Sequence, residues 1–205
     1  MGPLIIAGVL LNKEKEKLFK EKGVKDSKLL SHKKRCELAE FIKRNADDYV
    51  ILTITVEEID AAVDHENKSY NLNWLEADKS VEIIEQLEPD VAILDCPSPN
   101  IKKYKAYVQE RVGDAIELIV EHKADVNHVA CSAASILAKC LREEEMEKIQ
   151  KKYGNTGPGY TSNLTTQKFL KENWNKHPEI FRKSWISWKN HRDEKKQKKL
   201  DEFEC

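Results

Sequence analysis

The chain has 205 residues and a formal net charge of −1, with 40% hydrophobic and 35% charged residues. This length predicts one domain of ordinary size, and the apolar content excludes global disorder. The longest apolar run, residues 3–11, is about half of the roughly 20 residues that a membrane-spanning helix needs. Because that run has no basic segment before it and no cleavage site after it, we exclude a secretory signal and expect a cytoplasmic protein.

Hydrophobic periodicity predicts alternating strands and helices in the first half of the chain. A buried apolar strand at residues 4–11 comes first, a helix capped by Ser31 follows, and residues 49–56 form a second strand. A helix over residues 72–87 ends at Pro89, since proline cannot continue a helical ladder. A third strand, residues 91–94, follows at once.

The second half continues this alternation as far as Tyr153 and then changes character. Asn100 caps the next helix, a fourth strand covers residues 116–120, and a long helix begins near residue 126 with small side chains that allow close packing on a sheet. Residues 154–159, with three glycines and a proline, break the pattern before a helix at residues 164–174. This order predicts an α/β fold with a helical C-terminal piece.

Charge is segregated along the chain despite the net value near zero. Residues 13–35 contain ten Lys or Arg against four Asp or Glu, and residues 182–199 contain eight against two. Such basic stretches are either solvated helix faces or a rim that binds phosphate. Charge alone leaves both interpretations open.

The five cysteines are an odd number at irregular spacing, and none forms a Cys-x-x-Cys pair. We therefore expect reduced thiols rather than zinc or redox chemistry. Cys131 and Cys140 fall on one predicted helix about 13 Å apart, too far to share a metal ion.

Two aspartates follow predicted strands directly. Asp95 ends the third strand, and Asp125 lies between the fourth strand and the small-residue helix. Ligands of open α/β sheets gather at the carboxyl ends of strands, so these side chains are candidates for one site. Each also has a structural interpretation, Asp95 as a turn residue and Asp125 as a helix N-cap.

Paired carboxylates repel one another unless cations hold them, and their oxygen ligands suit Mg²⁺ or Mn²⁺. Two such ions would polarise a phosphodiester and activate a water molecule. The chain lacks the Gly-rich phosphate loops and the Gly-x-Ser-x-Gly elbow of other catalytic classes. Two aspartates are few ligands for such a site, and their structural interpretations stay open beside metal-assisted hydrolysis.

Aromatic side chains in the C-terminal part have two interpretations each. Tyr160 follows the glycines at 157 and 159, where it either packs over the core or exposes its ring for stacking on a sugar or base. Trp185 and Trp188 alternate with basic residues, and we expect at least one of these indoles to pack in the core.

Several segments in this order resemble the ribonuclease HII family, most closely its archaeal members. The most specific are His122-Lys123-Ala124-Asp125 and the helix with Ser132-Ala133-Ala134-Ser135. The remaining matches are Gly2-Pro3-Leu4, residues 24–30, Asp95 at its strand end, Tyr153-Gly154, Gly157-Pro158-Gly159-Tyr160 and Trp185. The resemblance covers nearly the whole chain.

The resemblance implies an RNase H-like fold, a mixed sheet flanked by helices, with a catalytic core at residues 1–153 and a substrate-recognition loop and helical basic region at 154–205. It implies cleavage of the RNA strand of RNA–DNA hybrids, and of single ribonucleotides in duplex DNA, by a monomer that uses Mg²⁺ or Mn²⁺. Asp95 and Asp125 match the third and fourth active-site carboxylates. Tyr160 and Gly159 match substrate-binding positions, and Lys28 is a candidate phosphate contact.

The chain also departs from the family pattern. The family begins with a strand carrying Asp-Glu-x-Gly-Arg-Gly, which supplies two further carboxylates, and this sequence contains no such motif. The resemblance therefore implies that the first strand, central in the sheet, is absent. One hypothesis is that Met1 is an internal methionine of a longer chain, and the other is that the chain is this short and its activity very weak. Smaller departures are Pro158, Thr161, Asn163, Leu164 and Glu143.

Three functions are thus compared. The first is the metal-dependent endoribonuclease, the second a nucleic-acid-binding module without catalysis, and the third a structural remnant without affinity for nucleic acid. A binding module would show salt-sensitive duplex binding with little turnover. We expect no sliding-clamp-binding peptide at residues 201–205.

Overall fold

The computed structural model describes residues 1–25, 30–64 and 70–192. Tertiary contacts divide the chain into two compact units, each of which is described by itself. The strand unit comprises Ile5–Thr53 and Leu72–Arg142, and the helical unit comprises Met1–Leu4, Ile54–Asn71 and the residues from Glu143 onward. Each unit combines stretches that are separate in the sequence. The expected division into residues 1–153 and 154–205, which follows chain order, stays a prediction.

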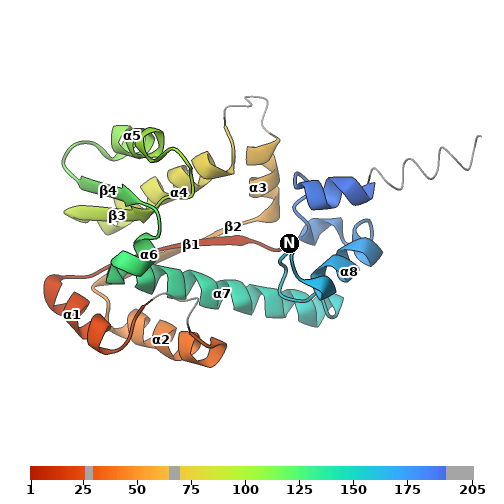
Figure 1. Cartoon of the computed structure of the whole chain (residues 1–205), viewed down its shortest axis with the longest axis horizontal. Coiled ribbons are helices and arrows are strands. Elements are labelled where there is room, and N and C mark those ends of the chain that lie inside the picture. The colour runs from red at the N-terminus through yellow and green to blue at the C-terminus, as the bar shows by residue number, and fades with distance from the viewer. Residues whose placement is uncertain (26–29, 65–69, 193–205) are drawn as a thin grey trace, which may run out of the picture. The chain divides into compact units, whose positions relative to one another are not determined.

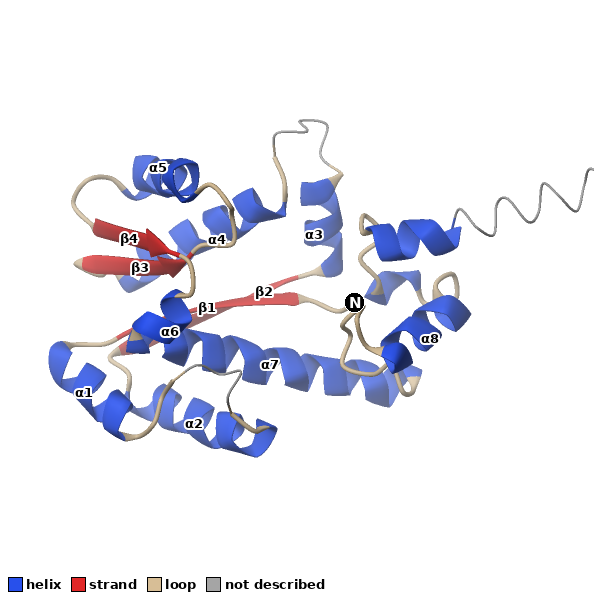
Figure 2. Cartoon of the chain, viewed as in Figure 1, coloured by secondary structure: helices blue, strands red, loops and turns tan. Residues whose placement is uncertain are grey.

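Four strands form two pairs (Figure 2). β1 (Leu4–Leu10) pairs with β2 (Asp48–Ile54), and β3 (Val91–Asp95) pairs in parallel with β4 (Glu117–Glu121). Where the resemblance implies one mixed sheet, the described strands form these two separate two-stranded sheets. The predicted strands are all present, each within two residues of its expected bounds.

Helices surround the strands of the strand unit (Figure 1). They are α1 (Lys13–Glu21), α2 (His32–Asn45), α4 (Leu72–Leu87), α5 (Ile101–Val112), α6 (Ala124–Asn127) and the first part of α7 (Val129–Tyr153). The predicted N-caps are confirmed, because the side chains of Ser31 and Asn100 accept hydrogen bonds from the backbone N–H groups of Lys34 and Lys103.

Two apolar clusters hold the strand unit together. In the first, Leu38 and Ile42 of α2 pack with Ile136 and Leu137 of α7, and β1 and β2 contribute half-buried side chains. In the second, α4 and α5 pack on β3 and β4 around the fully buried Tyr104. Gly8 permits close approach of α4 to β1, because a Cβ atom there would lie 2.3 Å from a methyl carbon of Ile83.

The helical unit contains α3 (Val56–Val63), the end of α7, α8 (Leu164–Asn173), the 3₁₀ turn Pro178–Ile180 and a helical segment at residues 186–192. Its core is formed by Met146, Phe169, Leu170 and Phe181 with neighbours. Trp188 packs against this core, and its indole N–H donates to the carbonyl of Trp174 at 3.2 Å. The expectation that one C-terminal indole is part of the core is confirmed.

Helices α1 and α3 were not predicted. The apolar pattern gives no helix at the position of α1 and extends the second strand to Val56, which instead begins α3. The hydroxyl of Thr55 accepts from the Glu58 N–H at 3.2 Å, and the Glu58 carboxylate accepts from the Thr55 N–H at 2.7 Å. This reciprocal capping box ends the strand two residues earlier than the apolar pattern suggests.

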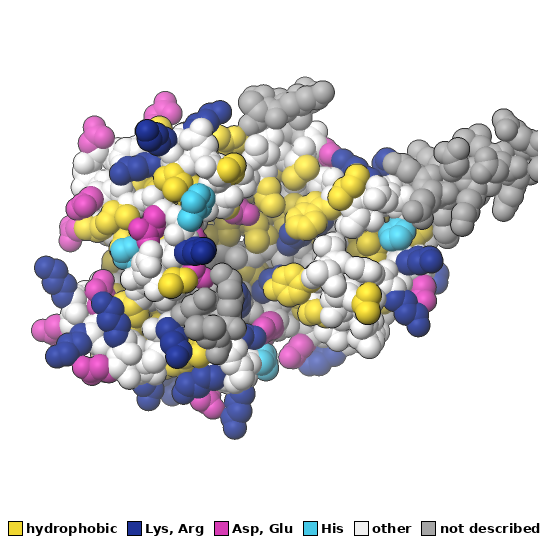
Figure 3. Space-filling view, viewed as in Figure 1, with side chains coloured by type: hydrophobic (Ala, Val, Ile, Leu, Met, Phe, Trp, Pro, Cys, Tyr) yellow, Lys and Arg dark blue, Asp and Glu magenta, His cyan; other side chains and the backbone are white. Residues whose placement is uncertain are grey.

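The basic start of the chain falls on the exposed sides of α1 and α2. Oppositely charged side chains accompany it, and Figure 3 shows blue and magenta groups interspersed over one face of the molecule. The N–O pairs are Lys34–Glu37 at 3.5 Å, Lys43–Glu40 at 3.1 Å and Lys15–Asp47 at 2.6 Å. These contacts favour the solvated-face interpretation for α1 and α2. Within the described ranges, no helix has the length and apolar character of a membrane span.

Candidate active site

The candidate site lies where the parallel strands β3 and β4 end. Figure 2 shows both arrows ending beside α6. Asp95 is the last residue of β3 and is in register with Glu121, the last residue of β4. The Cys96 N–H donates to the Glu121 carbonyl at 2.8 Å, which extends the pairing by one bond. The turn that follows β4 therefore starts beside Asp95.

The carboxylate of Asp95 is exposed, and the backbone of this turn holds one of its oxygens. Oδ1 accepts from the Lys123 N–H at 2.8 Å and from the Ala124 N–H at 3.4 Å. The turn interpretation of Asp95 thus has a structural basis, but across two strand ends rather than within its own loop. Asp95 orients the segment that contains Asp125.

Lys123 adopts the left-handed conformation, with φ 62° and ψ 35°. For a residue with a side chain this conformation costs about 1–2 kcal/mol. It turns two successive N–H groups toward Asp95, and these hydrogen bonds offset the cost. His122 fixes the start of the same turn, with its Nδ1 atom 3.0 Å from the Cys96 carbonyl oxygen.

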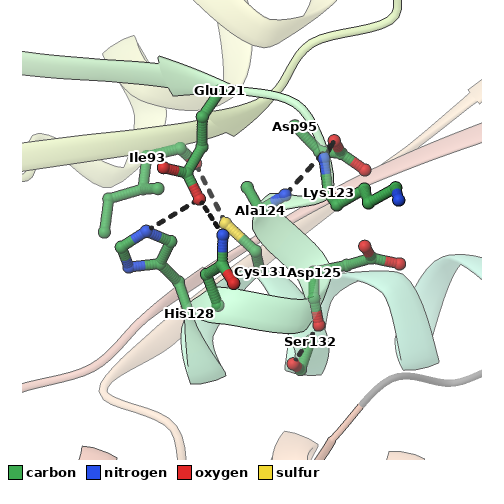
Figure 4. Close-up of polar contacts among 10 residues, drawn as sticks. Ile93, Asp95, Glu121, Lys123, Ala124, Asp125, His128, Cys131 and Ser132 are labelled. Atoms are coloured by element: carbon green, nitrogen blue, oxygen red, sulfur yellow. Dashed lines mark hydrogen bonds and ion pairs between the residues drawn. The ribbon is translucent and has the colours of Figure 1, made fainter.

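Asp125 lies in the short helix α6 and is only 4% exposed. Its carbonyl accepts from the Ser132 hydroxyl at 2.6 Å, which ties α6 to the first turn of α7. The interpretation of Asp125 as the N-cap of the long helix does not describe its place, because α6 and α7 are separate and His128 between them has an extended backbone. In Figure 4 the carboxyl groups of Asp95 and Asp125 point to the same side.

The half-buried thiol of Cys131 lies beside these carboxylates. Cys131 donates to the Ile93 carbonyl at 3.3 Å, and the pKa of its thiol is raised to about 12. Burial is the largest cause, and the negative charges of Asp95, Asp125 and Glu121 follow in that order. Both predicted aspartates therefore act on the same sulfur atom.

Sequence analysis did not identify the cluster around Glu121. Its Oε1 atom accepts from the Asn127 side-chain amide at 2.8 Å and lies 3.2 Å from Nε2 of His128. Figure 4 shows the Glu121 carboxylate and the His128 ring facing each other beside α6. They hold the end of α6 to the end of β4. The residue types that follow β4 in the sequence did not predict these contacts.

The described residues contain no group of three or more His, Cys, Asp or Glu side chains arranged to hold a metal ion. The oxygen donors that the turn brings together are those of Asp95 and Asp125. Carboxylate oxygens are hard ligands, and Mg²⁺ is commonly bound through one or two carboxylates with water and substrate phosphate completing its shell. The chemistry of this donor set therefore fits a hard divalent cation.

Three further site residues were predicted. Lys28 is among the residues that the structure does not describe. Gly159 and Tyr160 belong to the helical unit, in the loop between α7 and α8, and the Tyr160 side chain is 52% exposed. Of the two interpretations of Tyr160, the exposed ring is the one found.

Threonines brace this loop, which we call the glycine loop (residues 154–160). Thr156 is fully buried, and its carbonyl accepts from the hydroxyl of Thr166 at 2.9 Å. The same hydroxyl accepts from the Gly159 N–H at 3.1 Å. Asn163, at a position where the family often has aspartate, caps α8 by accepting from the Thr166 N–H at 3.1 Å. The backbone beside Tyr160 is thereby fixed.

Comparisons with known proteins agree on one family. The family model described as ribonuclease HII matches residues 1–188. The ribonuclease HII of Thermococcus sibiricus is 38% identical over 194 residues, which is 92% of this chain and 84% of that protein. Among curated relatives, the ribonuclease HII of Pyrococcus furiosus is 36% identical and covers 99% of this chain and 92% of its own length.

Solved structures show the same relationship. The ribonuclease H2 of Pyrococcus horikoshii OT3 superposes with a TM-score of 0.85 at 32% identity, covering 95% of this chain and 92% of that one. An RNase HII in complex with PCNA, from Archaeoglobus fulgidus, gives a TM-score of 0.80 at 34% identity, with 93% and 88% covered. Bst-RNase HIII in complex with Mn²⁺, at 19% identity, shares the fold.

Proposed function

The chain belongs to the ribonuclease HII family, and from this premise we propose that it cleaves the RNA strand of RNA–DNA hybrids and single ribonucleotides embedded in duplex DNA. The members of this family are hydrolases of the ribonuclease H type. The single observation that carries the proposal is that Asp95 accepts hydrogen bonds from the turn leading into α6, which places its carboxylate on the same side as that of Asp125 (Figure 4). The substrate, the reaction and the residue roles given below are parts of the proposal.

Asp95 and Asp125 would hold Mg²⁺ or Mn²⁺. Asp95 is exposed, and one of its carboxylate oxygens accepts hydrogen bonds from backbone N–H groups. Asp125 is held in place by α6. A divalent ion held there would supply Lewis-acid polarisation of the phosphate and would lower the pKa of bound water. The contribution of the protein is a pair of carboxylates fixed before substrate arrives.

The proposed reaction is hydrolysis of the phosphodiester on the 5′ side of a ribonucleotide. Water adds to phosphorus, the bond to the 3′ oxygen of the preceding nucleotide breaks, and the products are a 5′-phosphate and a 3′-hydroxyl. A cation held by the oriented carboxylates would bring substrate phosphate and water together, which would make the attack an effectively unimolecular step.

Substrate recognition is assigned to the glycine loop. The exposed ring of Tyr160 offers a flat face for stacking on a sugar or base, and the backbone at Gly159 is held by Thr166. Lys28 is proposed as a phosphate contact. An RNA–DNA duplex is the proposed partner of a monomeric protein. The prediction of no clamp-binding peptide at residues 201–205 rests on their sequence, and these residues lie outside the described part of the chain.

The test is cleavage of a labelled duplex containing one ribonucleotide, with and without Mg²⁺. We expect Mg²⁺-dependent products with a 3′-hydroxyl, and we expect Asp125→Asn and Asp95→Asn each to lower the rate by at least about a hundredfold, since several kcal/mol of charge stabilisation is lost. Asp114→Asn, an exposed carboxylate in the same unit, is the matched control and should keep the rate. Full activity in Asp125→Asn would remove the role assigned to it.

The rival function, a binding module without catalysis, gives a different result in the same assay. It predicts duplex binding that weakens steeply with salt and no Mg²⁺-dependent product. A structural remnant would show neither product nor salt-dependent binding. A titration of the duplex at several salt concentrations separates these two outcomes.

A further inference from the structure

Two cysteines that are far apart in the sequence meet inside the strand unit. Cys36 is on α2 and Cys140 is on α7, 104 residues apart, and their sulfur atoms lie 3.5 Å from each other. Both belong to the apolar cluster that joins these helices. A disulfide bond is about 2.05 Å long, so the sulfur atoms must approach by only about 1.5 Å to bond.

The two thiols differ in access. Cys140 is 4% exposed, whereas Cys36 is half-buried at the edge of the cluster. His32 lies one turn before Cys36 on α2 and is exposed, and its Nε2 atom is 3.7 Å from the Cys36 sulfur. An imidazole at this position can take the thiol proton, and the thiolate is the reactive form of cysteine. Cys36 is therefore the thiol that an oxidant reaches first.

The other described cysteines have no such arrangement. Cys96 is buried and donates to the Ser98 carbonyl at 3.4 Å. Cys131 donates to the Ile93 carbonyl, and burial together with nearby carboxylates raises the pKa of its thiol to about 12. Neither is therefore poised as a nucleophile, and the contact between Cys36 and Cys140 is the one that brings two described sulfur atoms together.

We propose that Cys36 and Cys140 form a reversible intramolecular disulfide that joins α2 to α7. The co-reactant is a small-molecule disulfide such as oxidised glutathione. His32 accepts the Cys36 proton, and the thiolate attacks one glutathione sulfur, breaking the glutathione S–S bond and releasing one glutathione thiolate. The Cys140 thiol gives its proton to that thiolate and attacks the Cys36 sulfur, which forms the protein disulfide and releases the second glutathione. Two protein thiols are oxidised and one glutathione disulfide is reduced.

This bond would act on the part of the molecule that carries the carboxylates. Helix α7 begins directly after α6, and Ser132 in its first turn holds Asp125. Closing a loop of about 100 residues restricts the unfolded chain, so oxidation should raise Tm by about 5–10 °C. The described cysteines are free thiols in this structure, as expected, and the proposed disulfide of Cys36 and Cys140 would be a second, oxidised form.

The experiment uses the full chain in a Cys205→Ser background, incubated with oxidised glutathione and digested with trypsin without reduction. Cleavage after Arg35 and Lys139 leaves peptides 36–43 and 140–142, each with one cysteine. We expect mass spectrometry to find these two peptides linked, the link to disappear after dithiothreitol, and Tm to rise only in the linked protein. Cys36→Ser and Cys140→Ala should abolish the link, while Cys96→Ser should keep it.

A separate variant tests the role of His32. His32→Gln should slow formation of the link by about tenfold or more at neutral pH without changing its final extent. Glutathione left on Cys36 with no link to Cys140, or a link to Cys131 in similar yield, would overturn the proposal. An unchanged Tm after complete linkage would overturn the stabilising effect. If Cys140→Ala does not fold, Cys36→Ser gives the same comparison at a less buried position.

Discussion

The carboxylate turn after β4 and the glycine loop after α7 hold their key side chains in opposite ways. In the turn, a side chain fixes the backbone, because the Asp95 carboxylate accepts two N–H groups and holds Lys123 in a left-handed conformation. In the loop, Gly157 and Gly159 have positive φ angles, and the Thr166 hydroxyl holds the loop backbone through hydrogen bonds with Gly159 and Thr156. The turn buries Asp125 at 4% exposure, while the loop leaves Tyr160 at 52%.

Under the proposed function, this difference corresponds to the different roles of the two regions in binding a substrate. A carboxylate that binds a cation must be placed before the cation arrives, so the turn accepts backbone strain in return for fixed oxygens. A ring that stacks on a sugar or base must be accessible, so the loop fixes only the backbone beneath it. Substitutions can break either arrangement separately.

Gly157→Ala should damage the glycine loop most. The residue has φ +65°, and an added Cβ would lie 2.7 Å from the Thr166 hydroxyl oxygen and 3.0 Å from the Thr166 backbone nitrogen. Conformational strain and overlap together should lower the free energy of unfolding by about 3 kcal/mol, as measured by urea denaturation. Gly113→Ala is the matched control, since its φ is +77° with no atom within 4 Å of the added Cβ, and it should cost about 1 kcal/mol. Equal losses in both variants would contradict the role of Thr166.

Asp95→Ala should damage the carboxylate turn by about 2 kcal/mol, because the N–H groups of Lys123 and Ala124 lose their acceptor. Asp95→Asn retains an oxygen that accepts both groups and should be nearly as stable as the wild type, although it lacks the charge. Thermal denaturation compares the two. A destabilisation of the same size in both variants would show that the charge, rather than the hydrogen bonds, holds the turn.

Tyr160→Ala should leave stability nearly unchanged, because the ring is exposed, and should weaken binding to a ribonucleotide-containing duplex. Loss of one stacking contact is worth about 1–3 kcal/mol, or roughly five- to a hundredfold in Kd. Tyr160→Phe keeps the ring and should bind nearly as well. Fluorescence anisotropy with a catalytically impaired Asp125→Asn background measures the affinity without cleavage. Unchanged binding by Tyr160→Ala would end the stacking proposal.

Glu121→Gln should have the smallest effect. Its side-chain oxygen still accepts from the Asn127 amide, while the contact of the carboxylate with Nε2 of His128 is lost. Because both side chains are about one-third exposed, we expect the free energy of unfolding to fall by less than about 1 kcal/mol. His128→Gln in the same background should add nothing further in a double-mutant cycle. A clearly additive second loss would show that His128 has another partner that stabilises the turn.

Much of the local structure could be predicted from the sequence. The caps at Ser31 and Asn100, the strand that ends at Asp95, and the break at residues 154–159 all depend on neighbours within a few residues, so composition and spacing predict them. The order of strands and helices predicted the α/β class for the same reason. The family resemblance added the residues at which the chemistry is proposed.

The tertiary structure decided what depends on distant partners. The left-handed Lys123 needs Asp95 from 28 residues away, and the exposure of Tyr160 depends on the brace that Thr166 gives the loop. The contact of Cys36 with Cys140 spans 104 residues and has no signature in spacing. A pattern along the chain records which backbone conformation each residue favours, whereas these contacts arise only when packing of the apolar faces brings separate elements together.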